Sequence, residues 1–387
     1  MSSTRRLLIA VGPWQLVTLA AAVKQVNVPE ACDVLILQES YSPTPQLKDA
    51  MHAIAVALFP DAKVVPVFDS LAACRLKTIS GPQPILNEIR AACGEAPSEI
   101  WMAKLNHQPE RFILEAYPEA PITLYEDGTG TFVDVPVLGP GPIRAMAGRT
   151  LRAFGLRPQV VDVGDGSYLA TRHYQRLTRA VLYLQRDLQL PEYLKDRQVI
   201  SIGDDILRSR IAACAQVPTL RVATASSRLR RPIVLMLGQC MARSGLIELK
   251  DEIEIYRRSV AAVLEKGYSV LWRDHPRTHQ PYFDLMGDIA EPDRLQRLQA
   301  PDGYPVEIFV PHLGLSACIA GVSSAILYLK DLYGIPGYSF ADDLRPYLKI
   351  DANFRLIQQQ MAAHVAALSQ LPRHRTADVL REAITGV

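Results

Sequence analysis

Short apolar runs alternate with longer amphipathic segments through the first half of the chain. The runs have the length of buried strands, whereas the segments between them repeat apolar residues at helical spacing. In order they read RLLIAV, WQLVTLAAAVKQV, CDVLILQ, LKDAMHAIAVALF and AKVVPV, followed by SEIWMAKL, a helix near 108–116, and PITLYEDG. This alternation predicts parallel strands joined by crossover helices, which is a doubly wound α/β domain.

A second series of the same kind follows the arginine-rich stretch SSRLRRP at 226–232. It reads IVLMLG, the helix LKDEIEIYRRSVAAVLEKG, the strand YSVLWRDHP, the apolar runs VEIFV and LSACIAGVSS, and a helix over 323–333. A chain of 387 residues is also longer than one hydrophobic core normally supports. We therefore predict two Rossmann-like α/β domains, over 1–225 and 226–387, that face a central cleft. The C-terminal segment FRLIQQQMAAHVAALSQL is predicted to be a helix that packs across both.

The composition is that of a globular protein, with 49% hydrophobic and 21% charged residues. Lys and Arg total 42 against 40 Asp and Glu, so the chain has no bulk attraction for nucleic acid. Its six cysteines show no metal-ligand or disulfide spacing, which is typical of a reduced, cytoplasmic protein. The N-terminal apolar run is interrupted by Gly-Pro and is not expected to be a signal peptide, and no run is long enough to span a bilayer.

Basic residues gather where the strand YSVLW of the second domain ends, in the segment LWRDHPRT. Pro276 stops the strand from continuing as a central one and fixes His275 in a rigid turn, with Arg273 and Arg277 nearby. Guanidinium groups and an imidazole can together donate hydrogen bonds to a phosphate. The alternative is a salt-bridged turn in which His275 pairs with Asp274.

Two further strand ends of this domain have the composition of an anion site. In CIAGVSSAILYLKDLYG, Ser323 and Ser324 open a helix whose first amides are unpaired, although a serine in this place can simply cap the helix. In MLGQCMARSGLI, Gly238 permits close backbone approach, and Gln239 can hydrogen-bond a base or a phosphate. An ordinary turn has the same composition.

Acidic residues end a strand of the first domain in the segment LYEDGTG. The adjacent carboxyls of Glu126 and Asp127 can carry a proton near neutrality, as a general base must, and Gly128 lets the loop turn sharply. The alternative is an acidic hairpin turn. The segments GDGS at 164–167 and GDD at 203–205 are predicted to be surface turns, and no metal site is predicted.

The order of these motifs resembles that of one enzyme group. EDG in the first domain, then HP, then a Ser-Ser pair some way further along, resemble the motifs of the bacterial GT-B sialyltransferases, above all the polysialyltransferases and lipooligosaccharide sialyltransferases. VGPWQL at 11–16 and LGQ at 237–239 also resemble segments of those enzymes. The resemblance implies a GT-B fold, in which the N-terminal domain binds the acceptor and the C-terminal domain binds the nucleotide sugar.

The resemblance also implies roles for the residues that carry the motifs. Glu126 would be the general base that deprotonates the acceptor hydroxyl, with Asp127 supporting it. His275 would bind the CMP phosphate and assist its departure, and Ser323 and Ser324 would hold the same phosphate.

The remaining assignments concern binding. On the donor side they are Gly238, Gln239, Arg273, Pro276 and Arg277. On the acceptor side they are Gln15 and Gly128.

The activity implied is inverting transfer of a nonulosonic acid, first of all sialic acid, from a CMP-sugar to a surface glycan or glycolipid. The resemblance implies no cofactor and no metal, and a cytoplasmic location at the inner face of the membrane, with which peripheral membrane association is compatible. Three alternatives remain open: a CMP-Kdo-dependent transferase, a UDP-sugar epimerase-like enzyme of the same fold, and a non-catalytic nucleotide-sugar-binding protein.

The sequence shows no extended basic track of the kind that would hold a long anionic polymer. The scattered basic residues that could serve a shorter acidic acceptor are predicted to be solvated instead; they are Lys104, Arg144, Arg149, Arg152 and Arg157.

Overall fold

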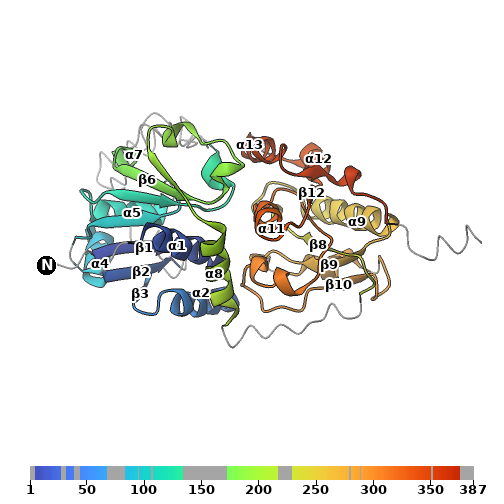
Figure 1. The fold of residues 1–387 in the computed structure, drawn as a ribbon, viewed down its shortest axis with the longest axis horizontal. Coiled ribbons are helices and arrows are strands. Elements are labelled where there is room, and N and C mark those ends of the chain that lie inside the picture. Colours follow the sequence, from blue (N-terminus) through green and yellow to red (C-terminus); the bar gives the residue numbers. More distant parts are fainter. Residues whose placement is uncertain are drawn as a thin grey trace, which may run out of the picture. The chain divides into compact units, whose positions relative to one another are not determined.

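The computed structural model divides into two compact units, Met1–Val217 and Pro218–Val387. The predicted boundary at 225 lies a little beyond this division. The residues that the structure describes are 5–27, 32–38, 44–67, 83–94, 96–105, 108–133, 172–216, 229–278, 280–287, 289–349 and 352–374. Each unit contains one parallel sheet covered by helices (Figure 1).

The sheet of the first unit has the strand order β3-β2-β1-β4-β5-β6-β7. All neighbouring strands pair in parallel. The strands are β1 (Arg5–Ala10), β2 (Cys32–Gln38), β3 (Lys63–Val67), β4 (Glu99–Met102), β5 (Ile122–Tyr125), β6 (Leu177–Leu182) and β7 (Gln198–Ser201). The order reverses between β1 and β4, and at such a point the loops after the two strands separate and leave room for a ligand.

Helices pack on both faces of this sheet, as predicted for a doubly wound domain (Figure 1). One group comprises α1 (Pro13–Val26), α2 (Pro45–Leu58) and α8 (Asp204–Ala215), which contact one another. A second comprises α4 (Gln83–Cys93) and α5 (Gln108–Ala116), and the short α7 (Arg172–Gln175) precedes β6. Helix α1 begins directly after β1 because Gly12 takes an extended conformation at the N-cap and Pro13 already has the φ angle of a helix.

The second sheet has the order β10-β9-β8-β11-β12-β13, again entirely parallel. The strands are β8 (Ile233–Leu237), β9 (Ser269–Arg273), β10 (Leu295–Arg297), β11 (Ala317–Ala320), β12 (Gly337–Ser339) and β13 (Ala366–Ala367). Here the order reverses between β8 and β11. Both central strands are buried along their whole length, which explains their uninterrupted apolar sequences.

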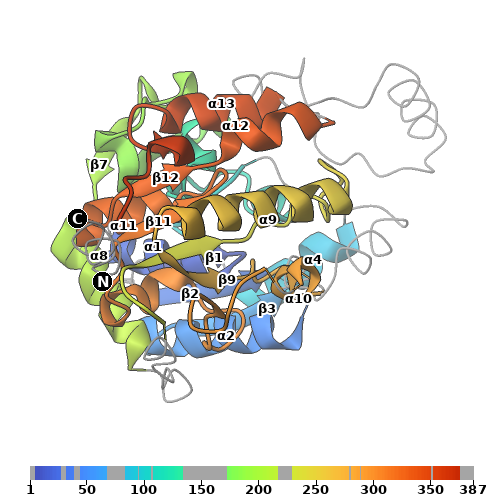
Figure 2. The same ribbon diagram turned by 90° about the vertical axis from the view of Figure 1, so that its right-hand side faces the viewer.

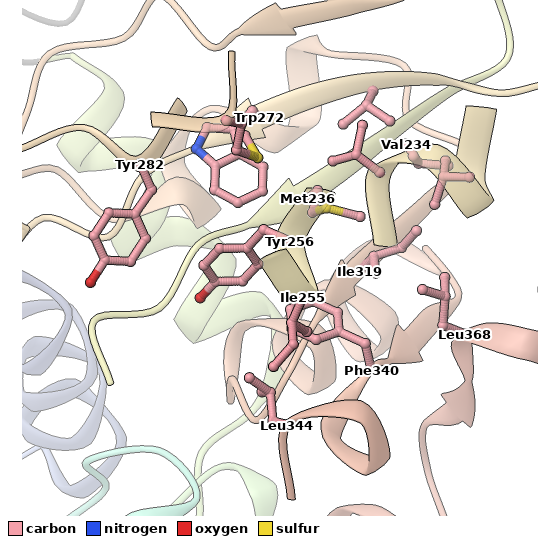
Figure 3. Close-up of a cluster of buried hydrophobic side chains, with 14 of the residues drawn as sticks. Val234, Met236, Ile255, Tyr256, Trp272, Tyr282, Ile319, Phe340, Leu344 and Leu368 are labelled. Atoms are coloured by element: carbon pink, nitrogen blue, oxygen red, sulfur yellow. The ribbon is translucent and has the colours of Figure 1, made fainter. Parts of the chain in front are cut away.

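The helices of this unit are α9 (Leu249–Glu265), α10 (Tyr282–Met286), α11 (Ala325–Tyr333), α12 (Ala341–Leu344) and α13 (Ala352–Met361). Helix α9 lies along the sheet (Figure 2) and buries Ile255, Tyr256, Val260 and Val263 in the core. These side chains pack with Trp272 of β9 and with residues of β8, β11 and the C-terminal segment (Figure 3).

Two segments differ from their predicted structure. VEIFV forms the 3₁₀ helices η8 (Val306–Ile308) and η9 (Val310–His312) instead of joining the sheet. Prolines on either side explain this, because they cannot donate to a strand ladder. The predicted C-terminal helix ends at Met361, and the chain then forms β13, which pairs with β12. That this C-terminal segment packs across both units stays a prediction.

The described residues include no helix that combines the length and the apolar character needed to cross a bilayer.

We predict that the buried carboxyl of Glu307 in η8 makes the second unit less stable as the pH rises. Burial raises the pKa of Glu307 from 4.5 to about 7. Between these values the unfolded chain has lost the proton that the folded protein keeps, so a rising pH favours unfolding, by up to about 1.4 kcal/mol per pH unit. Glu307→Gln should therefore stabilise the protein by roughly 2–3 kcal/mol more at pH 8 than at pH 5. Urea unfolding of both proteins at the two pH values measures this, and an equal effect at both would contradict it.

Candidate functional site

Nearly all predicted site residues lie at or after the carboxyl ends of strands that form the reversal of each sheet or lie next to it. In the first unit they follow β1 and β5. In the second unit they end or follow β8, β9 and β11. The two groups lie in different units and are described separately.

Glu126 immediately follows β5 and is completely buried. Its Oε2 accepts hydrogen bonds from the backbone N–H groups of Tyr183 (2.7 Å) and Leu184 (2.8 Å), where β6 ends. Its own carbonyl accepts a hydrogen bond from Thr18 Oγ1 of α1 (2.8 Å). Glu126 thus joins the ends of two strands and helix α1, and its carboxylate does not reach solvent.

Asp127, in contrast, has a side chain that is 16% exposed. Its Oδ1 accepts a hydrogen bond from Gln15 Nε2 of α1, and its Oδ2 forms an ion pair with Lys104, which follows β4. The backbone N–H of Asp127 donates to Thr131 Oγ1 (2.8 Å), and Gly128 adopts a positive φ of 77° that glycine accommodates without strain. Asp127 is therefore held in a fixed position while part of its carboxylate remains accessible.

Gln15 is the residue that orients Asp127 from the other side of the reversal point. Its Oε1 accepts a hydrogen bond from the Val11 N–H (2.8 Å), which fixes the amide so that Nε2 points to Asp127. The structure thus brings together Gln15 and Asp127, which are far apart in the sequence. Lys104 was predicted to be a solvated basic residue, but its side chain is only 34% exposed and forms an ion pair with Asp127.

In the second unit, the two charged residues before the HP turn are engaged within the protein. Arg273 is buried, and its guanidinium donates to the carbonyls of Ala300 (3.0 Å) and Pro301 (2.9 Å). Burial lowers the pKa of Arg273, and the neighbouring Asp302 opposes that shift. The guanidinium thus holds the loop after β10 in place. Direct contact of Arg273 with the nucleotide-sugar donor stays a prediction.

Asp274 organises the segment that follows the turn. Its Oδ1 accepts hydrogen bonds from Trp272 Nε1 (3.0 Å) and from the N–H of Tyr282 (2.7 Å), and its Oδ2 lies 3.1 Å from Nε of Arg297. Asp274 thereby anchors the start of α10. The alternative ion pair between Asp274 and His275 is not found among the described residues.

His275 is half-buried, and its ring has a defined protonation pattern. Its Nδ1 accepts a hydrogen bond from the Arg277 N–H (3.1 Å), so the proton of the neutral ring is on Nε2. Burial lowers the pKa of His275 to about 4, and the charges of Arg277 and Arg243 act in the same direction. The turn is closed by Thr278, whose N–H donates to the His275 carbonyl (3.0 Å), with Pro276 between them. His275 therefore offers a neutral Nε2–H donor at the end of β9.

Arg243 is a residue that the sequence analysis missed. It lies in the loop between β8 and α9, and its guanidinium donates to the carbonyl of Arg277. Both side chains are exposed, so two guanidinium groups lie beside His275. The only sequence signal was an arginine in the turn ARSG, which is too common to indicate a site.

Gln239 connects the two strands on either side of the reversal point. Its Nε2 donates to the Val322 carbonyl (2.8 Å), and its Oε1 accepts from the Val322 N–H (3.0 Å). Both polar groups of the amide are thus used within the protein, and Gln239 positions the segment that leads to Ser323 and Ser324. Direct contact of Gln239 with a nucleotide stays a prediction.

Two glycines allow these strand ends to come so close. A Cβ atom at Gly238 would lie 2.9 Å from Cζ2 of Trp272. A Cβ atom at Gly321 would overlap Gln239 Oε1 and come within 2.6 Å of Cδ1 of Leu344. Packing inside the unit therefore requires both glycines.

Ser324 is the N-cap of α11, but its side chain makes no capping hydrogen bond. Both Ser323 and Ser324 are half-buried, and neither hydroxyl bonds to another described residue. The first amides of a nine-residue helix and two uncommitted hydroxyls thus lie beside Val322. Such a combination can bind an anion.

The other candidates do not add to the site. Arg144, Arg149, Arg152, Arg157 and the segment GDGS at 164–167 lie outside the described residues. The predicted surface turn GDD is instead the start of α8, with Gly203 as its N-cap. Among the described residues, no group of three His, Cys, Asp or Glu side chains is placed to hold a metal ion.

Solved structures with a similar fold include three that align with nearly the whole chain. UGT73P12 from Glycyrrhiza uralensis, complexed with glycyrrhetinic acid 3-O-monoglucuronide, has a TM-score of 0.54 at 11% identity, over 97% of this chain and 83% of that one. A putative UDP-N-acetylglucosamine 2-epimerase from Listeria monocytogenes has 0.52 at 10% identity, over 100% and 88%. UDP-GlcNAc 2-epimerase from Methanocaldococcus jannaschii has 0.50 at 11% identity, over 99% and 100%.

These likenesses confirm the predicted GT-B fold of two Rossmann-like domains. No curated protein matches the sequence. The model of the family described as alpha-2,8-polysialyltransferase (POLYST) matches residues 6–341, which include every predicted site residue. The chain therefore belongs to the alpha-2,8-polysialyltransferase family, and it is a glycosyltransferase of the sialyltransferase type.

Proposed function

We propose that this enzyme transfers sialic acid from CMP-sialic acid to a hydroxyl of a glycan acceptor with inversion at the anomeric carbon. The observation that carries the proposal is the group of donors at the strand ends of the second unit. The neutral Nε2–H of His275 and the uncommitted hydroxyls of Ser323 and Ser324 can all donate to a phosphate.

The donor step follows from this chemistry. The bond between the anomeric carbon and the phosphate oxygen breaks, and its electron pair leaves with CMP. Hydrogen bonds from His275 and the two serines, together with the N-terminus of α11, stabilise the growing negative charge on the phosphate. Arg243 and Arg277 add positive charge beside His275, which favours the acidic donor.

On the acceptor side we assign the base to Asp127 instead of Glu126. The support is geometric, because a general base must reach the hydroxyl that it deprotonates, and only Asp127 of the two has an exposed carboxylate. Asp127 takes the proton of the acceptor hydroxyl while that oxygen bonds to the anomeric carbon. Glu126 keeps the loop in place through Tyr183 and Leu184.

The identity of the acceptor, the absence of a metal requirement and a location at the inner face of the membrane stay predictions. Lys104 beside Asp127 supports an acceptor that itself carries a carboxylate, such as a sialylated glycan.

A donor panel tests the proposed function. CMP-Neu5Ac, CMP-Kdo, UDP-sugars and GDP-sugars are each incubated with the purified protein, with and without EDTA, and nucleotide release and glycan products are measured. We expect slow hydrolysis of CMP-Neu5Ac alone and transfer once a sialylated acceptor is added. Release from CMP-Kdo only, or selective binding of UDP, would overturn the choice of donor.

The assignment of the base is tested by two near-isosteric variants. Asp127→Asn should lower kcat by about 10²–10⁴-fold, because the amide cannot accept the proton of the acceptor hydroxyl. The affinity for CMP and the melting temperature should change little. Glu126→Gln should lower the melting temperature, because an amide cannot accept both backbone hydrogen bonds as well as a carboxylate does, and should keep a measurable kcat. If Glu126→Gln abolished transfer in a stably folded protein and Asp127→Asn remained active, the base would be Glu126.

The state of His275 can be measured directly. In an NMR titration of the free protein, the imidazole should remain neutral from pH 8 down to about 5, because its pKa lies near 4. His275→Ala should weaken CMP binding by roughly tenfold or more, the loss expected for one hydrogen bond to a charged group. His275→Gln, which keeps an N–H donor near the position of Nε2, should lose less. Titration near pH 6.5, or equal affinity in both variants, would contradict the neutral-donor role.

A further inference from the structure

A carboxylate that the sequence analysis did not single out lies beneath the strand-end loops of the second unit. Glu252, in the first turns of α9, is completely buried. Its Oε1 accepts hydrogen bonds from Tyr256 Oη (2.8 Å) and the Met241 N–H (3.2 Å). Its Oε2 accepts from the Ala242 N–H (2.8 Å) and Tyr282 Oη (3.2 Å). Four donors from three segments thus converge on one side chain.

The first connection leads to the reversal point of the sheet. The hydroxyl of Tyr256 donates a hydrogen bond to Glu252 and accepts one from the backbone N–H of Gln239 (2.8 Å). Gln239 in turn makes two hydrogen bonds to Val322, the residue before Ser323. Glu252 is therefore connected to Val322 through Tyr256 and Gln239.

The second connection leads to the HP turn. Tyr282 donates to Glu252 through its hydroxyl, and its backbone N–H donates to Asp274, the residue before His275. The hydroxyls of Tyr256 and Tyr282 emerge on the same side of the hydrophobic cluster (Figure 3). One carboxylate therefore joins all three loops that carry the proposed phosphate ligands.

Stability alone does not explain a carboxylate at this place. Burial raises the pKa of Glu252, which means that the charged form is costly there despite its four hydrogen bonds. A buried ionic group is often replaced by apolar residues without loss of stability, provided that its partners are replaced too. Here two of the partners are backbone amides, which only an acceptor can satisfy, and both belong to the loop that leads from Gln239.

We infer that Glu252 is a positioning residue for the donor site: it fixes the loop after β8, the HP turn and the segment before Ser323 in the arrangement that binds the donor phosphate. The inference rests on the proposed function, since it takes these three loops as the phosphate site. Because Glu252 is completely buried, we assign it no direct contact with either substrate.

The test compares Glu252→Gln with a matched control on the same helix, Val260→Ala. The glutamine keeps the size of the side chain, but its NH₂ group faces N–H and O–H donors, so the loops lose their common anchor. We expect the dissociation constant for CMP and the KM for the donor to rise at least tenfold, with the KM for the acceptor unchanged. Val260→Ala also removes buried contacts of α9 and should lower the melting temperature, yet leave the dissociation constant for CMP within about twofold.

A second variant keeps the inference testable if Glu252→Gln does not fold. Tyr256→Phe leaves the carboxylate and its two backbone partners in place but removes the hydroxyl that bonds to both Glu252 and Gln239, so it should weaken CMP binding severalfold. Wild-type affinity for CMP in a folded Glu252→Gln or in Tyr256→Phe would overturn the inference.

Hydrogen exchange separates this inference from the proposed function. In the absence of any donor, Glu252→Gln should speed exchange of the Gln239, Met241, Ala242 and Val322 amides, whereas Val260→Ala should not do so selectively. If the wild type did not bind CMP at all, the proposed function would fail, and selective exchange at these amides would still show whether Glu252 fixes the loops. Unchanged exchange would overturn the positioning role.

Discussion

Each sheet reverses its strand order at one point, and the loops that leave the strands there must be held together by side chains because no ladder hydrogen bond joins them. In the second unit Gln239 does this through its paired hydrogen bonds with Val322. In the first unit Gln15 and Lys104, from opposite sides of the reversal, both bind Asp127. The polar groups proposed to act on substrates are fixed by these contacts, so the geometry of each site depends on how its reversal point is bridged.

A buried glutamate supports the strand-end loops in both units. Glu126 accepts hydrogen bonds from two backbone amides where β6 ends, and Glu252 accepts hydrogen bonds from two amides of the loop after β8. In both cases the carboxylate is buried, and backbone N–H groups donate hydrogen bonds to it. The groups proposed to act on substrates thus differ from those that support the loops: the carboxylate of Asp127 is partly exposed and the imidazole of His275 is half-buried, whereas Glu126 and Glu252 are completely buried.

Much of the fold could be predicted from the sequence, because apolar periodicity marks buried parallel strands and amphipathic helices directly. The prediction failed for VEIFV, where flanking prolines prevent an apolar run from forming a strand. It also failed after Met361, where a segment with helical apolar spacing contains a short edge strand. The motif residues were found because they follow strand ends. The different burial of Glu126 and Asp127, the partner of Lys104 and the hydrogen bonds of Glu252 were not accessible, because each depends on a contact between segments that only the strand order brings together.

The close approach at Gly321 couples two positions that are distant in the sequence. A side chain larger than hydrogen at position 321 would displace the amide of Gln239, so the residue that position 321 tolerates depends on the residue at position 239. Replacement of either residue alone disrupts the bridge between β8 and β11, and alanine at 321 would require both a shorter residue at 239 and a shift of the buried Leu344 side chain. Related sequences should therefore change these two positions together. A Gln239–Gly321 pair would then indicate the same contact between β8 and β11 even in sequences that differ elsewhere.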